Sequence, residues 1–186
     1  MAIEAASKIG LISKALILCG ETPLTSLTDA RYGATVGSNL FEVLYENELQ
    51  SNRWRFAMKK DSLSRLTAVP LNQWQYAYQL PTDLLLPVGV YPPQPYEIYS
   101  NRIYTNASAV ELDYMFKPEV SALPAYFQAL MVYSLAKNMI KPITESDTAA
   151  QLMTAAYNRQ RNVAMFADAQ GRPSQQTFSN PFTDVR

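Results

Sequence analysis

The chain has 186 residues and a mass of 20.9 kDa, which is the length of one domain of ordinary size. Its 16 basic and 16 acidic residues give a formal net charge of zero, which argues against nucleic-acid binding by bulk charge. The sequence has no histidine, which excludes histidine-based catalytic triads and histidine metal ligands. The single cysteine, Cys19, excludes intrachain disulfides and multi-cysteine metal sites. We therefore expect no cofactor and no bound metal.

The composition predicts that part of the surface is covered by other protein. Only 17% of the residues are charged, whereas 48% are hydrophobic and 12 are tyrosine. Aromatic residues are enriched at the centres of protein interfaces, although a tyrosine-rich core is an alternative explanation. The apolar run over residues 9–19 is too short to span a membrane, so we expect no membrane association.

Two helices are predicted in the N-terminal part of the chain. Apolar residues at helical spacing predict a helix over residues 3–19, with Gly20 at the position that follows its end. Asp29 is expected to be the N-cap of a second helix, which runs to about Asn52.

Small and acidic residues mark two sides of the second helix. Gly33 and Gly37 lie on the same side, which predicts that a neighbouring helix approaches closely there. Glu42, Glu46 and Glu48 are expected to form a solvated acidic face.

The period of the hydrophobic pattern changes between Trp54 and Lys117. Prolines cut this region into pieces of strand length, and the alternation over residues 110–116 is typical of a half-buried strand. Residues 96–99 and 102–105 are predicted to form a hairpin with a two-residue turn at Ser100-Asn101. We expect one small antiparallel sheet here.

Two further helices and an arm are predicted after the strands. The third helix covers residues 125–140 and is ended by Lys141-Pro142, and Thr144 is expected to be the N-cap of the fourth. The apolar stripe predicted for the fourth helix consists of Leu152, Met153, Ala156, Gln160, Val163 and Ala167. The remaining residues show no periodicity, but Phe178 and Phe182 are two aromatic anchors in an otherwise polar segment.

These elements predict an α+β fold. Residues 1–52 and 119–169 are expected to form a mainly antiparallel bundle of about four helices, and residues 53–118 an inserted β-sheet lobe. Residues 170–186 are expected to form an extended C-terminal arm.

Several segments of the sequence, taken together with their order along the chain and their spacing, resemble the tail tubular protein A family, the head-to-tail adaptors of short-tailed bacteriophages. The resemblance extends over nearly the whole chain. It is carried by Gly20-Glu21-Thr22-Pro23, Asn52-Arg53-Trp54-Arg55-Phe56-Ala57, Tyr78-Gln79-Leu80-Pro81-Thr82-Asp83, Ile103-Tyr104-Thr105-Asn106, Val110-Glu111-Leu112-Asp113-Tyr114, Leu123-Pro124-Ala125-Tyr126-Phe127 and Ile143-Thr144-Glu145-Ser146.

The resemblance implies a structural virion protein without enzymatic activity. Family members form a dodecameric ring that joins the portal protein to the tail nozzle protein and continues the DNA channel. The protein would be made in the host cytoplasm and located in the neck of the virion. Glu42, Glu46 and Glu48 are then candidates for the channel-facing side, with an ordinary solvated face as the alternative. The arm is predicted to reach a neighbouring subunit or the portal through Phe178 and Phe182.

Two other functions are alternatives at this stage. A carboxylate-dependent cell-wall glycan hydrolase would need two acids flanking a cleft, and the acids are paired closely at Glu111 with Asp113 and at Glu145 with Asp147. A nucleic-acid-binding adaptor would use basic residues interleaved with Trp54 and Phe56. The densest basic run consists of Arg53, Arg55, Lys59, Lys60 and Arg65. An amphipathic strand is the simpler interpretation of this run.

Overall fold

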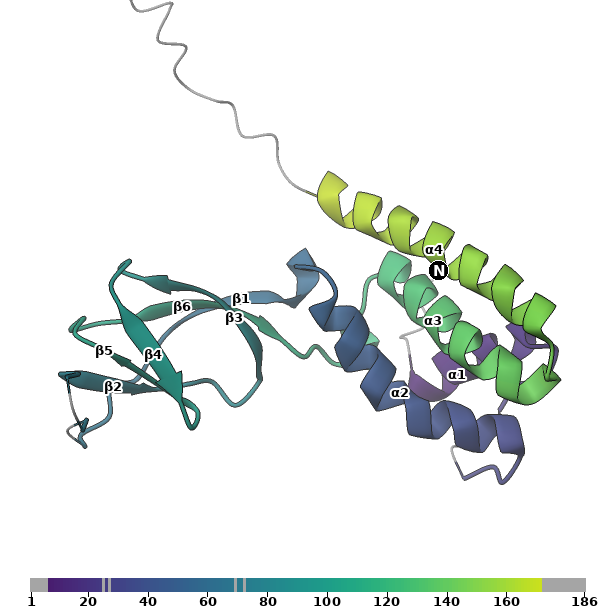
Figure 1. The fold of residues 1–186 in the computed structure, drawn as a ribbon, viewed down its shortest axis with the longest axis horizontal. Coiled ribbons are helices and arrows are strands. Elements are labelled where there is room, and N and C mark those ends of the chain that lie inside the picture. The colour runs from purple at the N-terminus through teal and green to yellow at the C-terminus, as the bar shows by residue number, and fades with distance from the viewer. Residues whose placement is uncertain (1–6, 25, 27, 69, 72, 172–186) are drawn as a thin grey trace, which may run out of the picture.

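The computed structural model describes residues 7–171, apart from residues 25, 27, 69 and 72. This part of the chain has an α+β fold with four α-helices and two three-stranded antiparallel sheets (Figure 1). In chain order, the elements are α1 (Lys8–Leu18), α2 (Tyr32–Gln50), η1 (Arg55–Ala57), β1 (Met58–Ser62), β2 (Tyr76–Gln79), β3 (Leu84–Tyr91), β4 (Tyr96–Tyr99), β5 (Arg102–Thr105), β6 (Glu111–Phe116), η2 (Val120–Ala122), α3 (Ala125–Thr144) and α4 (Asp147–Gln170). The helices gather at one end of the molecule and most of the strands at the other.

The C-terminal end of α1 follows the sequence signal, but both α1 and α2 begin later than predicted. Helix α1 begins at Lys8 and not at residue 3. Ser7 caps α1 by accepting a hydrogen bond from the Gly10 N–H, and Gly20 has a φ of +84° after its end. Asp29 is not the N-cap of α2, because the helix begins at Tyr32. The Asp29 carboxylate instead accepts bonds from the backbone N–H and the guanidinium of Arg31, which places it in the preceding turn.

The two glycines of α2 make room for its neighbours, as predicted. A Cβ at Gly37 would lie 2.7 Å from Ile12 of α1 and 3.1 Å from Met139 of α3. A Cβ at Gly33 would lie 2.8 Å from Leu16 of α1. Both positions therefore exclude a side chain unless the neighbouring residue moves.

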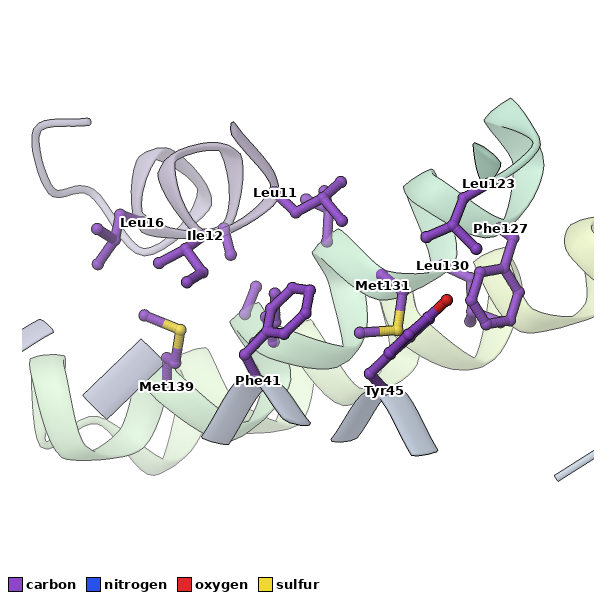
Figure 2. Close-up of a cluster of buried hydrophobic side chains, with 14 of the residues drawn as sticks. Leu11, Ile12, Leu16, Phe41, Tyr45, Leu123, Phe127, Leu130, Met131 and Met139 are labelled. Atoms are coloured by element: carbon purple, nitrogen blue, oxygen red, sulfur yellow. The ribbon is translucent and has the colours of Figure 1, made fainter. Parts of the chain in front are cut away.

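Helices α1, α2 and α3 share one hydrophobic core. Figure 2 shows Ile12 and Leu16 of α1 pointing toward the side of the cluster that holds Phe41 of α2 and Met139 of α3. Phe127 of α3 lies near the strand end of this core and packs edge-on against the rings of Trp54 and Phe56.

The strands form two sheets, which corrects the prediction of one. The first has the order β1-β6-β3 and the second the order β2-β5-β4. A separate core of buried residues lies between them and draws on both sheets. It comprises Leu63, Tyr78, Leu80, Ile103, Ala107, Val110, Leu112 and Tyr114. The split arises because β6 pairs with the distant β1 and with β3, and not with the β4–β5 hairpin that precedes it.

The β4–β5 hairpin forms where it was predicted. Tyr96 pairs with Thr105 and Tyr99 with Arg102, which leaves Ser100 and Asn101 as the turn. Both turn residues have positive φ, 46° and 62°, as a type I′ turn requires.

Strand β6 connects the two cores. Leu112 and Tyr114 point into the core between the sheets, whereas Met115, which is fully buried, belongs to the helical core. Because successive side chains of a strand alternate between faces, one strand is able to serve both cores.

The boundary between α3 and α4 lies later than predicted. Pro142 is inside α3, which continues to Thr144 and ends where Glu145 adopts a left-handed conformation with a φ of 54°. The Glu145 N–H bonds to the Lys141 carbonyl, so the last turn closes despite the proline. Ser146, not Thr144, caps α4 by accepting from the Ala149 N–H. Within the described residues, none of the helices has the length and hydropathy needed to cross a membrane.

Candidate assembly surfaces

The predicted acidic face is smaller and more neutral than expected. Glu42 pairs with the ammonium groups of Lys8 at 2.9 Å and of Lys117 at 3.1 Å, and Glu46 pairs with Lys117 at 2.8 Å. The bond from Lys8, opposed by burial and supported by Lys117, holds the pKa of Glu42 below its usual value. The face is therefore a mixed-charge surface that also ties the chain after β6 to α2.

Glu48 does not belong to that face, which corrects the prediction. It is 2% exposed, and its Oε1 accepts bonds from the Ser134 hydroxyl of α3 at 2.7 Å and the Tyr157 hydroxyl of α4 at 2.9 Å. Burial and then the bond to Glu48 raise the pKa of Tyr157 to about 12, so this hydroxyl stays protonated and donates. One carboxylate thus links three helices.

A second buried carboxylate holds the end of α4. Asp168 accepts the Tyr126 hydroxyl of α3 at 2.7 Å and the Arg55 backbone N–H at 3.2 Å. It is 7% exposed, and it fixes the last turn of α4 against the start of η1.

The outer side of α4 carries an exposed apolar stripe, called the α4 stripe below. It consists of Leu152, Val163 and Phe166, which are 69%, 52% and 66% exposed. The stripe predicted from the sequence mixed two sides of the helix, because Leu152 and Val163 face outward. The inward side of α4 is held to the other helices partly by hydrogen bonds of Tyr157 and Asp168, which a hydrophobic pattern does not reveal.

A groove lies between α1 and α3, called the α1–α3 groove below. It has a volume of about 410 Å³. Its lining is mainly apolar and includes Leu11, Leu18, Ala129, Val132 and Tyr133. In Figure 1, α3 lies between α4 and α1. The groove is lined by residues of α1 and α3, whereas the α4 stripe lies on α4.

A larger open groove of about 570 Å³ lies on the strands, and we call it the aromatic groove. It is formed by the outer face of the β2-β5-β4 sheet and by the chain that precedes β2. Three aromatic residues line it, Trp74, Tyr99 and Tyr104. The groove was not predicted, because a hydrophobic pattern does not show that the chain before β2 lies against the β4–β5 hairpin.

Three of the five basic residues in the run from Arg53 to Arg65 contact an acidic or aromatic side chain. Lys59 pairs with Asp83 at 3.1 Å and Lys60 with Asp113 at 3.0 Å, while the Arg65 guanidinium lies 4.0 Å from the centre of the Tyr76 ring.

The strand expected over the start of this run is also wrong. Trp54 is fully buried and Arg55–Ala57 is a 3₁₀ turn, because the Trp54 indole donates to the Glu48 carbonyl and its ring packs on Phe127.

One acid of each pair considered for hydrolysis lies in an ion pair. Asp113 binds Lys60 and is mostly covered, and Asp147 binds Lys141 at 2.7 Å at the start of α4. Among the described residues, no three acidic or cysteine side chains are grouped so that they could hold a metal ion. The arm residues Phe178 and Phe182 lie outside the described residues.

Comparison of the sequence with models of known protein families and with curated proteins finds no match.

Proposed function

We propose that the chain is a structural subunit of a closed ring, the head-to-tail adaptor that joins the portal of a short-tailed bacteriophage to the tail nozzle. Twelve copies would form the ring and continue the DNA channel. The proposal starts from the sequence resemblance, which extends over nearly the whole chain. The observation that carries it furthest is the pair of separate apolar surfaces on the helices.

A ring needs two different contact surfaces on each subunit, because each copy meets one neighbour with one side and the other neighbour with another. The α4 stripe is a convex apolar surface and the α1–α3 groove a concave one. Apolar side chains that are exposed along one helix face gain free energy when a neighbouring chain removes them from water. We propose that they meet between neighbouring copies.

The domain organisation follows from the same proposal. Residues 1–52 and 119–169 would form the helical bundle of the ring, with residues 53–118 as an inserted lobe that contacts a second ring. Glu42 and Glu46 remain candidates for the channel side. Their partners Lys8 and Lys117 bring the local charge near zero, so the surface would neither hold DNA by counterion release nor repel it strongly.

Native mass spectrometry of the purified chain, alone and with the portal protein of the same phage, tests this function. We expect a species of twelve copies, either alone or on the portal. A monomer under both conditions would contradict the ring. A ring of another closed size would keep the adaptor class and change only the symmetry.

A charged substitution on the α4 stripe tests the contact itself. Phe166→Asp is expected to prevent ring formation while leaving the circular dichroism spectrum of the subunit unchanged. The matched control is Val43→Asp on α2, which replaces an equally exposed apolar residue (67%) outside both surfaces. Normal rings of the Phe166 variant would show that α4 is not the side contact.

A further inference from the structure

The aromatic groove is a built site on the outer side of the second sheet. Side chains of a strand alternate, so Glu97, Tyr99, Arg102 and Tyr104 share the face opposite to Tyr78 and Ile103, which are in the core between the sheets. The chain before β2 forms the other side of the groove and is held by Trp74, whose indole N–H donates to Glu97 Oε2 at 2.9 Å.

The chemistry of the groove favours an aromatic side chain next to a carboxylate. The rings of Tyr99 and Tyr104 lie 6.2 Å apart, and small or apolar residues such as Ala77 and Leu71 line the groove together with Gln73, Glu97 and Arg102. Leu71 is 84% exposed, so its apolar side chain is accessible to a ligand in the groove.

The charges of the groove also favour a ligand that carries a carboxylate. Glu97 already accepts the Trp74 indole, whereas Arg102 makes no ion pair with any described residue. A ligand with an aromatic group and a carboxylate would use both features.

We propose that the aromatic groove binds the C-terminal arm of a neighbouring copy, with Phe182 between the groove's aromatic rings and Asp184 at Arg102. The inference rests on the proposed ring, because it takes the arm from a second subunit.

The arm has the sequence that this site requires. Phe182 and Asp184 are two residues apart, so in an extended segment they project from the same side, about 7 Å apart. Arg102 and Tyr104 have the same spacing on β5. Pro181 favours an extended conformation at the residue before it.

The length of the arm sets how far Phe182 can lie from the end of α4. Phe182 follows Gly171 by 11 residues, which span at most about 36 Å when extended. Strand β4 is the edge of its sheet, so its outer backbone groups are available to pair with an extended arm.

Peptide titration tests the site on the full chain. The receptor carries Phe178→Ala and Phe182→Ala, so its own arm does not compete, and the titrant is a synthetic peptide of residues 172–186. We expect saturable binding that weakens about tenfold or more with a Phe182→Ala peptide. An Asp184→Asn peptide should bind about two- to fivefold more weakly, and this difference should shrink in high salt.

Receptor variants locate the binding. Tyr99→Ala removes an exposed groove residue and should abolish the saturable binding. The matched control is Tyr96→Ala, an exposed tyrosine of the same strand that does not line the groove, and it should leave binding unchanged. No binding at peptide concentrations near 1 mM, or equal effects of the two tyrosine variants, would overturn the proposal.

Disulfide cross-linking shows which copy supplies the arm. The native Cys19 is buried, so we expect disulfides to form only between the engineered cysteines. Chains with Gln73→Cys at the groove, mixed with chains carrying Thr183→Cys, should yield cross-linked pairs, and Gln94→Cys should not. A chain that carries both engineered cysteines and forms the disulfide only within itself would overturn the assignment of the arm to a neighbouring copy. The mass measurement described above tests the ring separately, so a ring without peptide binding refutes only this inference.

Discussion

The helices and the strands of this molecule are stabilised in different ways. Among the described residues, the helical core contains 23 buried hydrophobic residues and the core between the sheets contains eight. Two buried carboxylates, Glu48 and Asp168, tie the helices together, whereas the strands carry ion pairs near the surface such as Lys59 with Asp83. The helices therefore form the rigid part of the subunit, and the strands present open surfaces on a smaller core.

The largest effect is expected in the helical core. Phe127→Ala removes a ring that packs on Tyr45, Trp54 and Phe56, and should lower the free energy of unfolding by about 3–5 kcal/mol. Urea unfolding followed by circular dichroism measures the loss. The control, Phe166→Ala, removes an exposed ring and should cost less than about 0.5 kcal/mol. Similar losses in both variants would show that the helical core is not as closely packed as described.

The next effect concerns the buried carboxylate. Glu48→Ala leaves the hydroxyls of Ser134 and Tyr157 without their acceptor and should lower the free energy of unfolding by about 1–3 kcal/mol. Glu46→Ala on the neighbouring surface should cost at most about 0.5 kcal/mol, because its ion pair with Lys117 is exposed. If the two alanine variants proved equally stable in urea, the three-helix link would contribute nothing.

In the strands, a gain of stability is expected at the hairpin turn. Ser100 and Asn101 both adopt positive φ, and replacing them by Asn-Gly supplies the residues that prefer this turn. The double variant Ser100→Asn, Asn101→Gly should raise the free energy of unfolding by about 0.5 kcal/mol. Asn101→Val should have the opposite sign, since a β-branched residue is strained there. Thermal melts of the three chains compare them, and a destabilised Asn-Gly variant would contradict the turn assignment.

The smallest effect is expected at the link between the two parts. The folded state lowers the pKa of Glu42 from an ordinary value of 4.5, so its contribution is present above that pH and is lost as the pH falls through the lowered pKa. Because Glu42 is about half exposed, the loss should be only a few tenths of a kcal/mol and should decrease with salt. Melting curves of the wild-type chain and Glu42→Gln should differ above about pH 5 and converge in acid. A difference that persists at pH 3 would point to another role for this side chain.

The elements that depend on local pattern could be predicted from the sequence, and those that depend on distant partners could not. The β4–β5 hairpin and the alternation of β6 are encoded by neighbouring residues. The pairing of β1 with β6 joins segments about 50 residues apart, and neither segment contains a local pattern that identifies its partner.

The three glutamates of the predicted acidic face do not share one side of α2. Glu42 and Glu46 are four residues apart and share a side of α2, but Glu48 lies about 200° around the helix from Glu46. Helical spacing alone separates Glu48 from the other two. Its partners Ser134 and Tyr157, in contrast, could be recognised only from the packed structure.

The position of Asp168 determines how the subunit would bear a mechanical load. A tension applied at Gly171 acts on α4 only three residues beyond this carboxylate, which holds the Arg55 backbone and the Tyr126 hydroxyl. The pull is therefore shared at once with α3 and with the chain that leads into β1, and α4 is not peeled from its free end. A force applied to the C-terminal segment would therefore strain the junction between the helices and the strands before it unfolds α4.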